Sequence, residues 1–485
     1  MRARHFGIVS FTAFVLAVST AAAAPHDLRL IDAARHDDLS EARALVAAGA
    51  DVNAHWGDGS TALHWAAQKD DAALADLLIS KGAKVDAATD LGVTPLWVAA
   101  GNSSPAMVER LLKAHANANS APPTGQTPLM IAARRGDAQV VKSLLGYGAD
   151  PNAKEAAHGQ TALMWASAER HPEVARLLLD AGADTRAHSK SWTQNVNVCC
   201  QETGNDEITA VVPRGGYTAL HFAAQYGDVE TVRLLVGAHA DLNEPAADGT
   251  SPLVVAAHVG QTDVAKALLD AGADPNAAGA GYNALHLAAT RGDVDLVQAL
   301  LAHGADVNAR QMKGSPTKRV ASGHSMDHRT IGATPFILAA RSGRLEVMKL
   351  LAAKGADLSL QTQDGRNALV VLASHGTVEG PRFPDQQAAE VIKLAVQLGT
   401  PVNEPNANGD TALHVAATLR RDVIVQALVD AGAALDARNH AGETPLALAL
   451  KPPVKRPISD VVDEYHFLLN HTQTAELLKK LGGKT

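Results

Sequence analysis

The sequence predicts an all-α solenoid of about 12 stacked helix-turn-helix units joined by hairpin fingers. The phrase T-A-L-H-W-A-A at Thr61 returns in eleven recognisable copies, the last of them T-P-L-A-L-A-L at Thr444, and their spacing centres on 33 residues. A tail of the form L-L-x-x-G-A-D-x-N-A follows most copies, as in the segment from Leu300. Aromatic residues make up only 4% of the chain, as expected where the core consists of thin contacts between helices.

The first unit differs from the others, and we interpret it as a cap. The segment from Leu28 keeps the tail but lacks the T-x-L-H start. A divergent end unit is expected because one of its faces is in water. We therefore predict one elongated solenoid domain over residues 27–485, with a cap repeat at 27–55. Further repeats start near residues 56, 89, 122, 156, 213, 246, 278, 329, 362, 406 and 439.

Each unit carries the signals of two short helices. Thr or Ser at the start of the phrase suits the N-cap of an inner helix, and Pro is tolerated at the next position because its missing N–H would be unpaired there anyway. The tail glycine ends the outer helix in a left-handed conformation. His115 and His239 replace this glycine in two units, and histidine tolerates positive φ. Together these motifs resemble the ankyrin-repeat family, and the resemblance covers nearly all of residues 27–485.

The resemblance implies a protein-binding surface on the concave side, formed by finger residues and exposed positions of the inner helices. The corresponding slots lie next to the signature Thr, after the Ala-Ala pair and before the tail glycine. Four of the five tyrosines of the chain occupy such slots, and Tyr and Arg are enriched in binding hot spots. The alternative is that these long side chains only cover helix stems. The predicted partner-binding residues are Arg134, Arg135, Tyr147, Tyr217, Gln225, Tyr226, His258, Tyr282, Arg291, Arg341 and Arg366.

Four histidines and two tryptophans are predicted to be structural. The histidines share one signature slot, which holds Trp97 or Met130 in other units, so we expect the ring to bond neighbouring backbone. We expect Trp65 and Trp165 in the core, whereas Trp56 and Trp192 lie in fingers and are candidate contacts. The four histidines are His64, His221, His286 and His414.

The first 24 residues have the pattern of a secretory signal peptide. Arg2 and Arg4 precede an apolar run, and the alanines that end at Ala24 form a cleavage site for signal peptidase. The alternative is an uncleaved membrane anchor, but the core of this segment is short and weakened by Ser, Thr and Ala. We expect an exported chain, periplasmic or secreted, with no membrane insertion after cleavage. Resemblance to secreted bacterial ankyrin proteins agrees with this location.

The composition and the missing motifs exclude several functions. The formal net charge is −8 and no basic tract is present, which argues against nucleic-acid binding. The sequence lacks a G-x-S-x-G elbow, a P-loop and a G-x-G-x-x-G motif after a strand. We therefore expect neither enzymatic activity nor a cofactor.

Two long insertions interrupt the period, at residues 188–212 and 310–330. Both fall at the finger between consecutive units, where insertions often form a binding face. At about 8–10 Å per packed helix layer, they would stand roughly 30 Å apart, like two walls around a ligand. The alternative is that long surface loops cost little and serve no function. Inserts after His375 and Lys451 are interpreted as elaborations of the C-terminal cap region.

The only two cysteines, Cys199 and Cys200, are adjacent in the first insertion. Neighbouring Cα atoms are about 3.8 Å apart, below the roughly 4.4–6.8 Å that disulfides prefer. Three interpretations follow: a strained disulfide between the two, a bond to a partner, or a soft-metal site. We favour the local disulfide and predict no bound metal, although His324 and His328 beside Asp327 are the best remaining candidate ligands.

The function predicted from the sequence is a protein–protein interaction scaffold that grips a partner protein in its concave groove. An alternative is a small-ligand or metal-binding protein that uses the two long loops. A third possibility is a secreted effector that acts on a host protein.

Overall fold

A computed structural model describes residues 28–199, 208–313, 315–319, 323–327, 330–374, 384–452 and 473–485. For residues 196–199, 208–210, 315–319 and 323–327 only the backbone is described. The predicted signal peptide, Cys200 and His328 lie outside these ranges. The chain forms two compact units, Met1–Ala156 and Ala157–Thr485, and each is considered by itself.

The first unit consists of four pairs of short helices. In every pair the outer helix ends at the tail, and in all pairs except the first, which is the cap, the inner helix begins at the signature phrase. The helices are α1 (Arg29–Arg35), α2 (Leu39–Ala47), α3 (Ala62–Lys69), α4 (Ala72–Ser80), α5 (Pro95–Gly101), α6 (Pro105–Lys113), α7 (Pro128–Arg135) and α8 (Ala138–Gly146).

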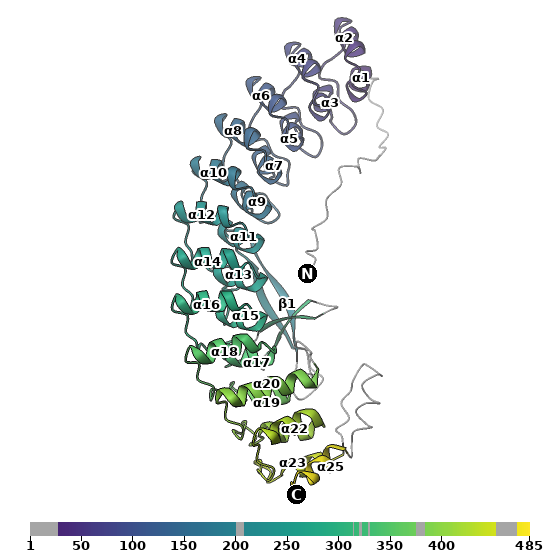
Figure 1. The fold of residues 1–485 in the computed structure, drawn as a ribbon. Coiled ribbons are helices and arrows are strands. Elements are labelled where there is room, and N and C mark those ends of the chain that lie inside the picture. The colour runs from purple at the N-terminus through teal and green to yellow at the C-terminus, as the bar shows by residue number, and fades with distance from the viewer. Residues whose placement is uncertain are drawn as a thin grey trace. The chain divides into compact units, whose positions relative to one another are not determined.

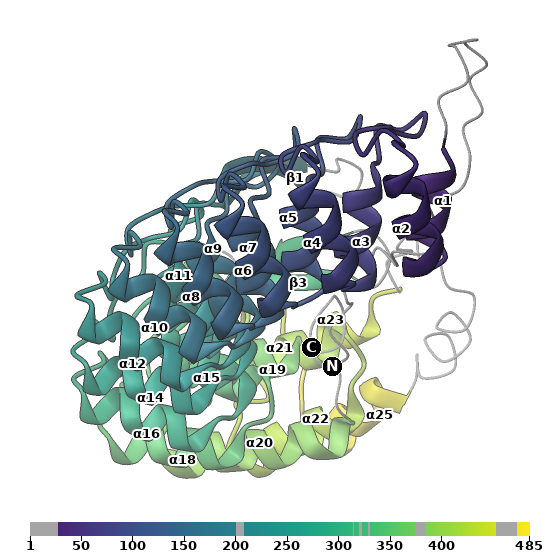
Figure 2. The same cartoon turned by 90° about the horizontal axis from the view of Figure 1, so that it is seen from above.

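The second unit continues the same pattern in two layers. Figure 1 and Figure 2 show the odd-numbered inner helices α9 to α17 stacked in one layer and the even-numbered outer helices α10 to α18 in the other. The first ten helices are α9 (Ala162–Glu169), α10 (Pro172–Asp180), α11 (Ala219–Tyr226), α12 (Val229–Gly237), α13 (Pro252–Val259), α14 (Thr262–Asp270), α15 (Ala284–Arg291), α16 (Val294–Ala302), α17 (Pro335–Arg341) and α18 (Leu345–Ala353). The remaining helices are α19 (Ala368–Ala373), α20 (Asp385–Leu398), α21 (Ala412–Thr418), α22 (Asp422–Asp430), α23 (Pro445–Leu450) and α25 (Gln473–Lys480).

The signature residues form the helix ends that the sequence predicts. The Thr127 side chain accepts a hydrogen bond from the backbone N–H of Met130, and Pro128 follows at the first helical position. His115 and His239 have φ values of 65° and 57°, which confirms that they replace glycine in the left-handed region. Inside the stack, Leu and Ala side chains are buried between neighbouring inner helices. The structure and the repeat pattern thus agree on an all-α repeat solenoid. No described helix is long and apolar enough to cross a bilayer.

The asparagine found in several of the tails joins one repeat to the next. Asn119 Nδ2 donates to the Gly148 carbonyl at 2.9 Å, and Asn119 Oδ1 accepts from the Asp150 N–H at 2.7 Å. Asn53, Asn276 and Asn403 repeat this pair of bonds in other units. The tail therefore ends the outer helix and also sets the position of the following repeat.

The two long insertions form a single four-stranded sheet, with strand order β2-β1-β4-β3. Antiparallel pairing joins β1 (Ser191–Cys199) to β2 (Ile208–Gly215), and β3 (Ser315–Arg319) to β4 (Gly323–Asp327). Strand β1 also pairs in parallel with β4, at Val198↔Met326 and Cys199↔Asp327. Our expectation of two separate walls is therefore wrong, although the feet of the two insertions are still three repeats apart. The first hairpin is long enough to reach the second, so the two insertions meet.

We predict that Asn119→Ala lowers the free energy of unfolding by about 1–2 kcal/mol, because two inter-repeat hydrogen bonds are lost at one position. Urea unfolding followed by circular dichroism measures the change. Lys142→Ala, at an exposed position of α8, is the control and is expected to change stability by less than about 0.5 kcal/mol. Equal stability of the Asn119→Ala variant and the wild type would show that the tail asparagine is not a significant link.

Candidate partner-binding surface

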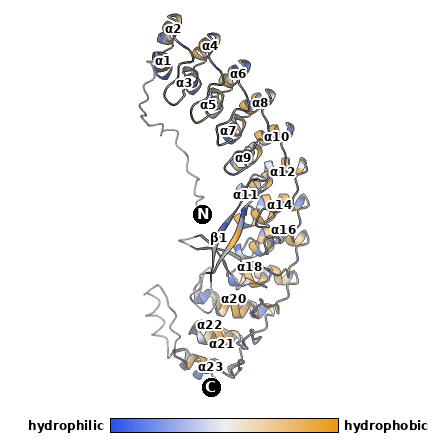
Figure 3. Ribbon diagram, turned by 180° about the vertical axis from the view of Figure 1, so that it is seen from behind, coloured by the Kyte–Doolittle hydropathy of each residue, from blue (hydrophilic) through white to orange (hydrophobic). Residues whose placement is uncertain are grey.

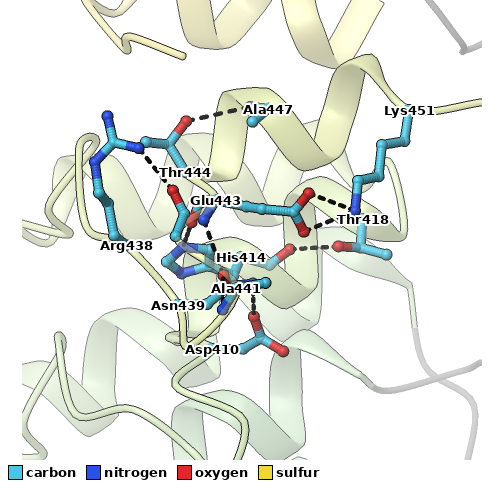
Figure 4. Close-up of polar contacts among 11 residues, drawn as sticks. Asp410, His414, Thr418, Arg438, Asn439, Ala441, Glu443, Thr444, Ala447 and Lys451 are labelled. Atoms are coloured by element: carbon cyan, nitrogen blue, oxygen red, sulfur yellow. Dashed lines mark hydrogen bonds and ion pairs between the residues drawn. The ribbon is translucent and has the colours of Figure 1, made fainter.

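The signature histidines are built into the contact between repeats. His64 Nδ1 accepts from the Thr61 N–H at 3.1 Å, so its Nε2–H is the donor to the Val93 carbonyl of the next finger at 3.0 Å. His221, His286 and His414 make the same two contacts with their own neighbours. Figure 4 shows the last of these rings bonded to the loop that carries Glu443. These histidines therefore hold repeats together and do not form a binding site.

Trp97 shows what this slot requires. It replaces the histidine in its unit, and its indole N–H donates to the Gln126 carbonyl of the next finger at 2.9 Å. A different ring thus supplies the same inter-repeat hydrogen bond. Burial lowers the pKa of His221 to about 4 and that of His286 to about 4, because a charged imidazole would be desolvated there. Both rings are therefore neutral at physiological pH.

At the foot of the first hairpin, two of the predicted partner-binding tyrosines lie near an ion pair. Arg214 of β2 lies 3.5 Å from Asp248 in the next finger. Tyr217 is half-buried and stacks on His221 with ring centroids 5.1 Å apart. Tyr282 is buried, with Val254 among its neighbours. We call Arg214, Tyr217, Asp248 and Tyr282 the hairpin-base cluster.

Burial and charge in this cluster favour a structural role. Burial raises the pKa of Tyr217 and of Tyr282, and the nearby Asp248 carboxylate raises both further. Both phenols remain protonated, so they can donate hydrogen bonds without adding negative charge beside Asp248. Tyr282 has too little exposed surface to contact a partner directly. The sequence placed Tyr217 and Tyr282 correctly beside the signature residue but could not show how deeply they are buried.

The last residues of five consecutive inner helices form a second group, the end row. Tyr226 ends α11 and is 44% exposed, and Val259 ends α13 and is 39% exposed. Arg291, which ends α15, is also exposed. Equivalent positions on packed helices are about 10 Å apart, so these side chains follow one another along the stack. The end row consists of Glu169, Tyr226, Val259 and Arg291, each eight residues after its N-cap, together with the half-buried Arg341, which lies one position earlier in its shorter helix.

The end row changes character along its length. The Glu169 carboxylate is close enough to Tyr226 to raise its pKa, although partial burial contributes more to that rise. The middle is aromatic and aliphatic, and the far end carries two arginines. Next to the row, Gln225 is half-buried and His258 is exposed. The row thus offers an acidic end, an apolar centre and a basic end.

Arg291 has a structural contact as well as an exposed position. Its Nη1 donates to the His258 carbonyl at 3.3 Å, at the C-terminal end of α13. The guanidinium covers Gly260, where φ is +84° and where a Cβ would displace the guanidinium. Arg344 repeats this contact one unit later, on the Thr290 carbonyl at 3.1 Å. A cation at the negative end of a helix is favourable, so these arginines stabilise the stack.

Other predicted residues lie away from the end row. Tyr147 follows the last residue of the outer helix α8, and its hydroxyl donates to Glu109 of the outer helix α6 at 3.4 Å. The slot before the tail glycine therefore belongs to the outer layer, and our placement of Tyr147 on the inner side is corrected. Arg366 forms an ion pair with Asp364 at 2.5 Å within its own finger, with its side chain mostly buried. In the first unit, Arg134 and Arg135 are exposed at the end of α7.

Two of the tryptophans lie nearer the surface than the sequence predicted. Trp65 and Trp165 are half-buried and not part of the core, because the space between alanine-rich helices is too thin for an indole. Trp65 packs against Trp56 with ring centroids 5.6 Å apart, and the Arg35 guanidinium lies over both rings. Trp192, predicted as a finger contact, is 54% exposed at the start of β1.

Sequence reasoning missed several exposed apolar residues. Val259 occupies the same slot as Tyr226, so a comparison of slots that included aliphatic residues would have found it. Met312 is 72% exposed at the start of the second insertion, and Val211 is exposed on β2. Neither belongs to a repeat slot, and the period gives no signal for them.

No group of three or more His, Cys, Asp or Glu side chains that could hold a metal occurs among the residues whose side chains are described. The register of β1 and β4 places Cys199 opposite Asp327 in the backbone. His324 lies on β4, three positions earlier. A disulfide between Cys199 and Cys200 stays a prediction, because Cys200 lies outside the described residues.

Comparison with known proteins agrees with the repeat architecture. Residues 30–122, 103–189, 195–279 and 220–311 match the family described as ankyrin repeats in three copies, and residues 331–363 and 408–440 match the single ankyrin repeat. The transient receptor potential cation channel subfamily A member 1 of Homo sapiens is 26% identical over 47% of this chain and 19% of its own length. Its Caenorhabditis elegans homolog is 31% identical over 24% of this chain and 9% of its own length. Protein phosphatase 1 regulatory subunit 27 of Mus musculus is 41% identical over 13% of this chain and 41% of its own length. The chain therefore spans less than half the length of each of these relatives.

We predict that the unfolding free energy falls as pH is lowered from about 6.5 to about 4, with His221 and His286 each contributing on the order of 2 kcal/mol. In this window the unfolded histidines take up a proton and the folded ones do not, so stability is present above the unfolded pKa and is lost on acidification. Urea titrations at pH 7.0 and 4.5 measure the difference.

The control for this prediction is the double substitution His221→Gln and His286→Gln. Glutamine at the third helical position can still complete a capping box but does not titrate. The double variant should lose less stability between the two pH values than the wild type. The same loss in both proteins would assign the acid sensitivity to other groups.

Proposed function

The chain belongs to the ankyrin-repeat family, and from this premise we propose that it is an interaction scaffold whose partner protein binds along the end row of residues 157–485. The carrying observation is the exposure of Tyr226, Val259 and Arg291 at equivalent ends of three successive inner helices. Ankyrin repeats bind proteins through exposed residues of their repeats, and the end row joins the predicted residues Tyr226, Arg291 and Arg341 to Val259 and Glu169, which were not predicted.

The apolar and charged side chains of the end row favour a partner whose own surface has apolar and acidic groups in the matching order. Its apolar centre fits an apolar or aromatic side chain of the partner, and the arginines at α15 and α17 fit acidic groups. Tyr226 combines a large apolar ring with a hydroxyl, which is typical of hot spots. The hairpin-base cluster contributes indirectly, because it orders the fingers that flank the same helices.

The proposal concerns binding and not catalysis. We assign no reaction to the chain. Binding of a metal or small ligand by the long insertions stays a prediction, since Cys200 and His328 lie outside the described residues. Action of the chain as a secreted effector on a host protein is a narrower version of the scaffold proposal.

The relatives do not identify the partner. One is named as a cation channel and another as a regulatory subunit of protein phosphatase 1, and this chain matches only parts of each. The matched parts are repeat arrays in this chain, which supports scaffolding in general. The partner is therefore proposed by chemistry alone: a protein segment with an apolar centre and an acidic end.

We expect Tyr226→Ala combined with Val259→Ala to weaken partner binding by 10-fold or more, because about 1.4 kcal/mol or more of apolar contact is removed from the centre of the row. A photo-crosslinking residue at position 226 identifies the partner, and calorimetry with the purified partner measures the affinity. Tyr147→Ala is the matched control, since Tyr147 is equally exposed, at 46%, but lies on the outer layer. Unchanged affinity in the double variant, or an equal loss in the control, would rule out the end row.

We further propose that the chain acts outside the cytoplasm, on the grounds of the predicted signal peptide at residues 1–24. Edman sequencing of the chain purified from its source cells should begin at Pro25, directly after the predicted cleavage site at Ala24. A chain that retains Met1 and Arg2 in the cytosolic fraction would contradict export.

A further inference from the structure

The two hairpins differ in how they are paired. β1 and β2 share eight register pairs and β3 and β4 share five, whereas β1 and β4 share only two. The two hairpins are thus separate structures that touch at one short place. That place is the parallel pairing of Val198 with Met326 and Cys199 with Asp327, which we call the latch.

The positions of the latch in the two hairpins are not equivalent. Cys199 is the last residue of β1 and lies far from the base of its hairpin. Asp327 is the last residue of β4 and pairs with Ser315, the first residue of β3, so it lies at the base of its hairpin. The far end of the first hairpin therefore reaches the foot of the second.

The length of β1 matches the distance to be crossed. Nine residues of extended strand span about 30 Å at roughly 3.3 Å per residue. Three repeat intervals separate the two insertions, and at about 10 Å per packed helix layer they also span about 30 Å. Figure 1 shows the strands running from α11 past α13 and α15 in the direction of α17. The first hairpin therefore runs in the direction of the stack and reaches the second insertion.

The foot of each hairpin is firmly held. At the first, the Tyr217 N–H donates to Ser189 Oγ at 2.9 Å and the Ala247 N–H donates to the Gly215 carbonyl at 3.0 Å. At the second, Gln311 is fully buried and its side chain donates to the Lys313 carbonyl at 2.6 Å. Two anchored feet joined by a latch form a closed ring with the helices between them.

The alternation of residues along the first hairpin agrees with a sheet that lies on the stack. Gln194, Val212 and Arg214 share one face by register and are half-buried, and Arg214 contacts Asp248 in the next finger. Trp192 lies on the same face and is 54% exposed. On the opposite face, Asn195 and Val211 are exposed. Figure 3 shows a hydrophobic stretch of the hairpin beside a hydrophilic one, in line with the apolar middle of β2 and the polar middle of β1. The face that carries Gln194, Val212 and Arg214 is therefore the more covered of the two, and its printed contact with the repeats is at the foot, through Arg214.

The outer strand β2 contains Pro213, which has no N–H and disfavours the addition of another strand at this edge. Extension of the sheet by a partner is thus less favoured than an internal role. We propose that the β1–β2 hairpin is an intramolecular strap, closed by the latch, that holds the repeats from α11 to α17 at a set spacing. This inference is independent of the identity of any partner.

Two reciprocal truncations of the full chain test the strap. The first replaces residues 196–210 with a two-residue turn and keeps the pairing of Asn195 with Val211. The second replaces residues 315–327 with a short Gly-Ser linker and keeps the foot at Gln311 and Thr330. Each variant removes the latch from a different side, and a third variant carries both truncations.

Hydrogen exchange in the outer helices α12, α14 and α16 is the readout. Each single truncation should speed exchange there by about 3- to 10-fold, because local opening of the spanned repeats no longer has to break the ring. The double truncation should add little to either single one, since all three variants lose the same latch. Helix α22 lies outside the spanned interval and should exchange at the wild-type rate, which also shows that the variants are folded.

Three outcomes would overturn the proposal. Wild-type exchange rates in α12, α14 and α16 of the truncated variants would show that the ring does not stabilise the spanned repeats. Effects that multiply in the double truncation would show that each hairpin acts only through its own local contacts. Equal acceleration in α22 would indicate a general loss of stability, unrelated to the spanned repeats.

Discussion

Everything in this fold depends on the contact between one repeat and the next. A pair of helices this short cannot bury both of its faces, and the alanine-rich inner helices supply only a thin apolar layer. Polar bonds of defined direction complete the interface: histidine or tryptophan rings reach a carbonyl of the following finger, and tail asparagines reach the following turn. Because these hydrogen bonds run only between neighbouring repeats, the stack is held by many similar interfaces, each of which contributes little stability by itself. We call these interfaces the joints.

The surface that remains for a partner follows from this use of side chains. Aromatic and imidazole rings near the start of an inner helix are occupied by contacts between repeats, as the stacking of Tyr217 on His221 and the hydrogen bond of His221 to the next finger show. At the C-terminal end of the same helices, the groups to be bonded are the last backbone carbonyls. One arginine can bond such a carbonyl and stay exposed, as Arg291 does with the carbonyl of His258. Side chains at the helix ends are therefore free to vary, and the unequal character of the end row reflects that freedom.

The repeat period predicted the helix pairs, the caps and the structural histidines, because all of these are local patterns that recur in every unit. It placed Tyr226 and Arg291 correctly on the inner helices. It could not show that Tyr282 is buried, which depends on how its finger packs, or that Arg366 pairs with Asp364, which depends on how the finger itself folds. The sheet was missed for a different reason. Pairing of Val198 with Met326 joins segments outside the period, and nothing in either segment alone signals the other.

The hairpin along the stack has a consequence for how this chain can change over generations. Repeat arrays commonly grow and shrink by duplication or loss of whole units, and each joint here is similar enough to allow it. Between the two insertions that freedom is restricted: adding one unit would lengthen the path by about 10 Å while the strand keeps its nine residues. The length of the hairpin therefore fixes the number of repeats that can lie between the two insertions.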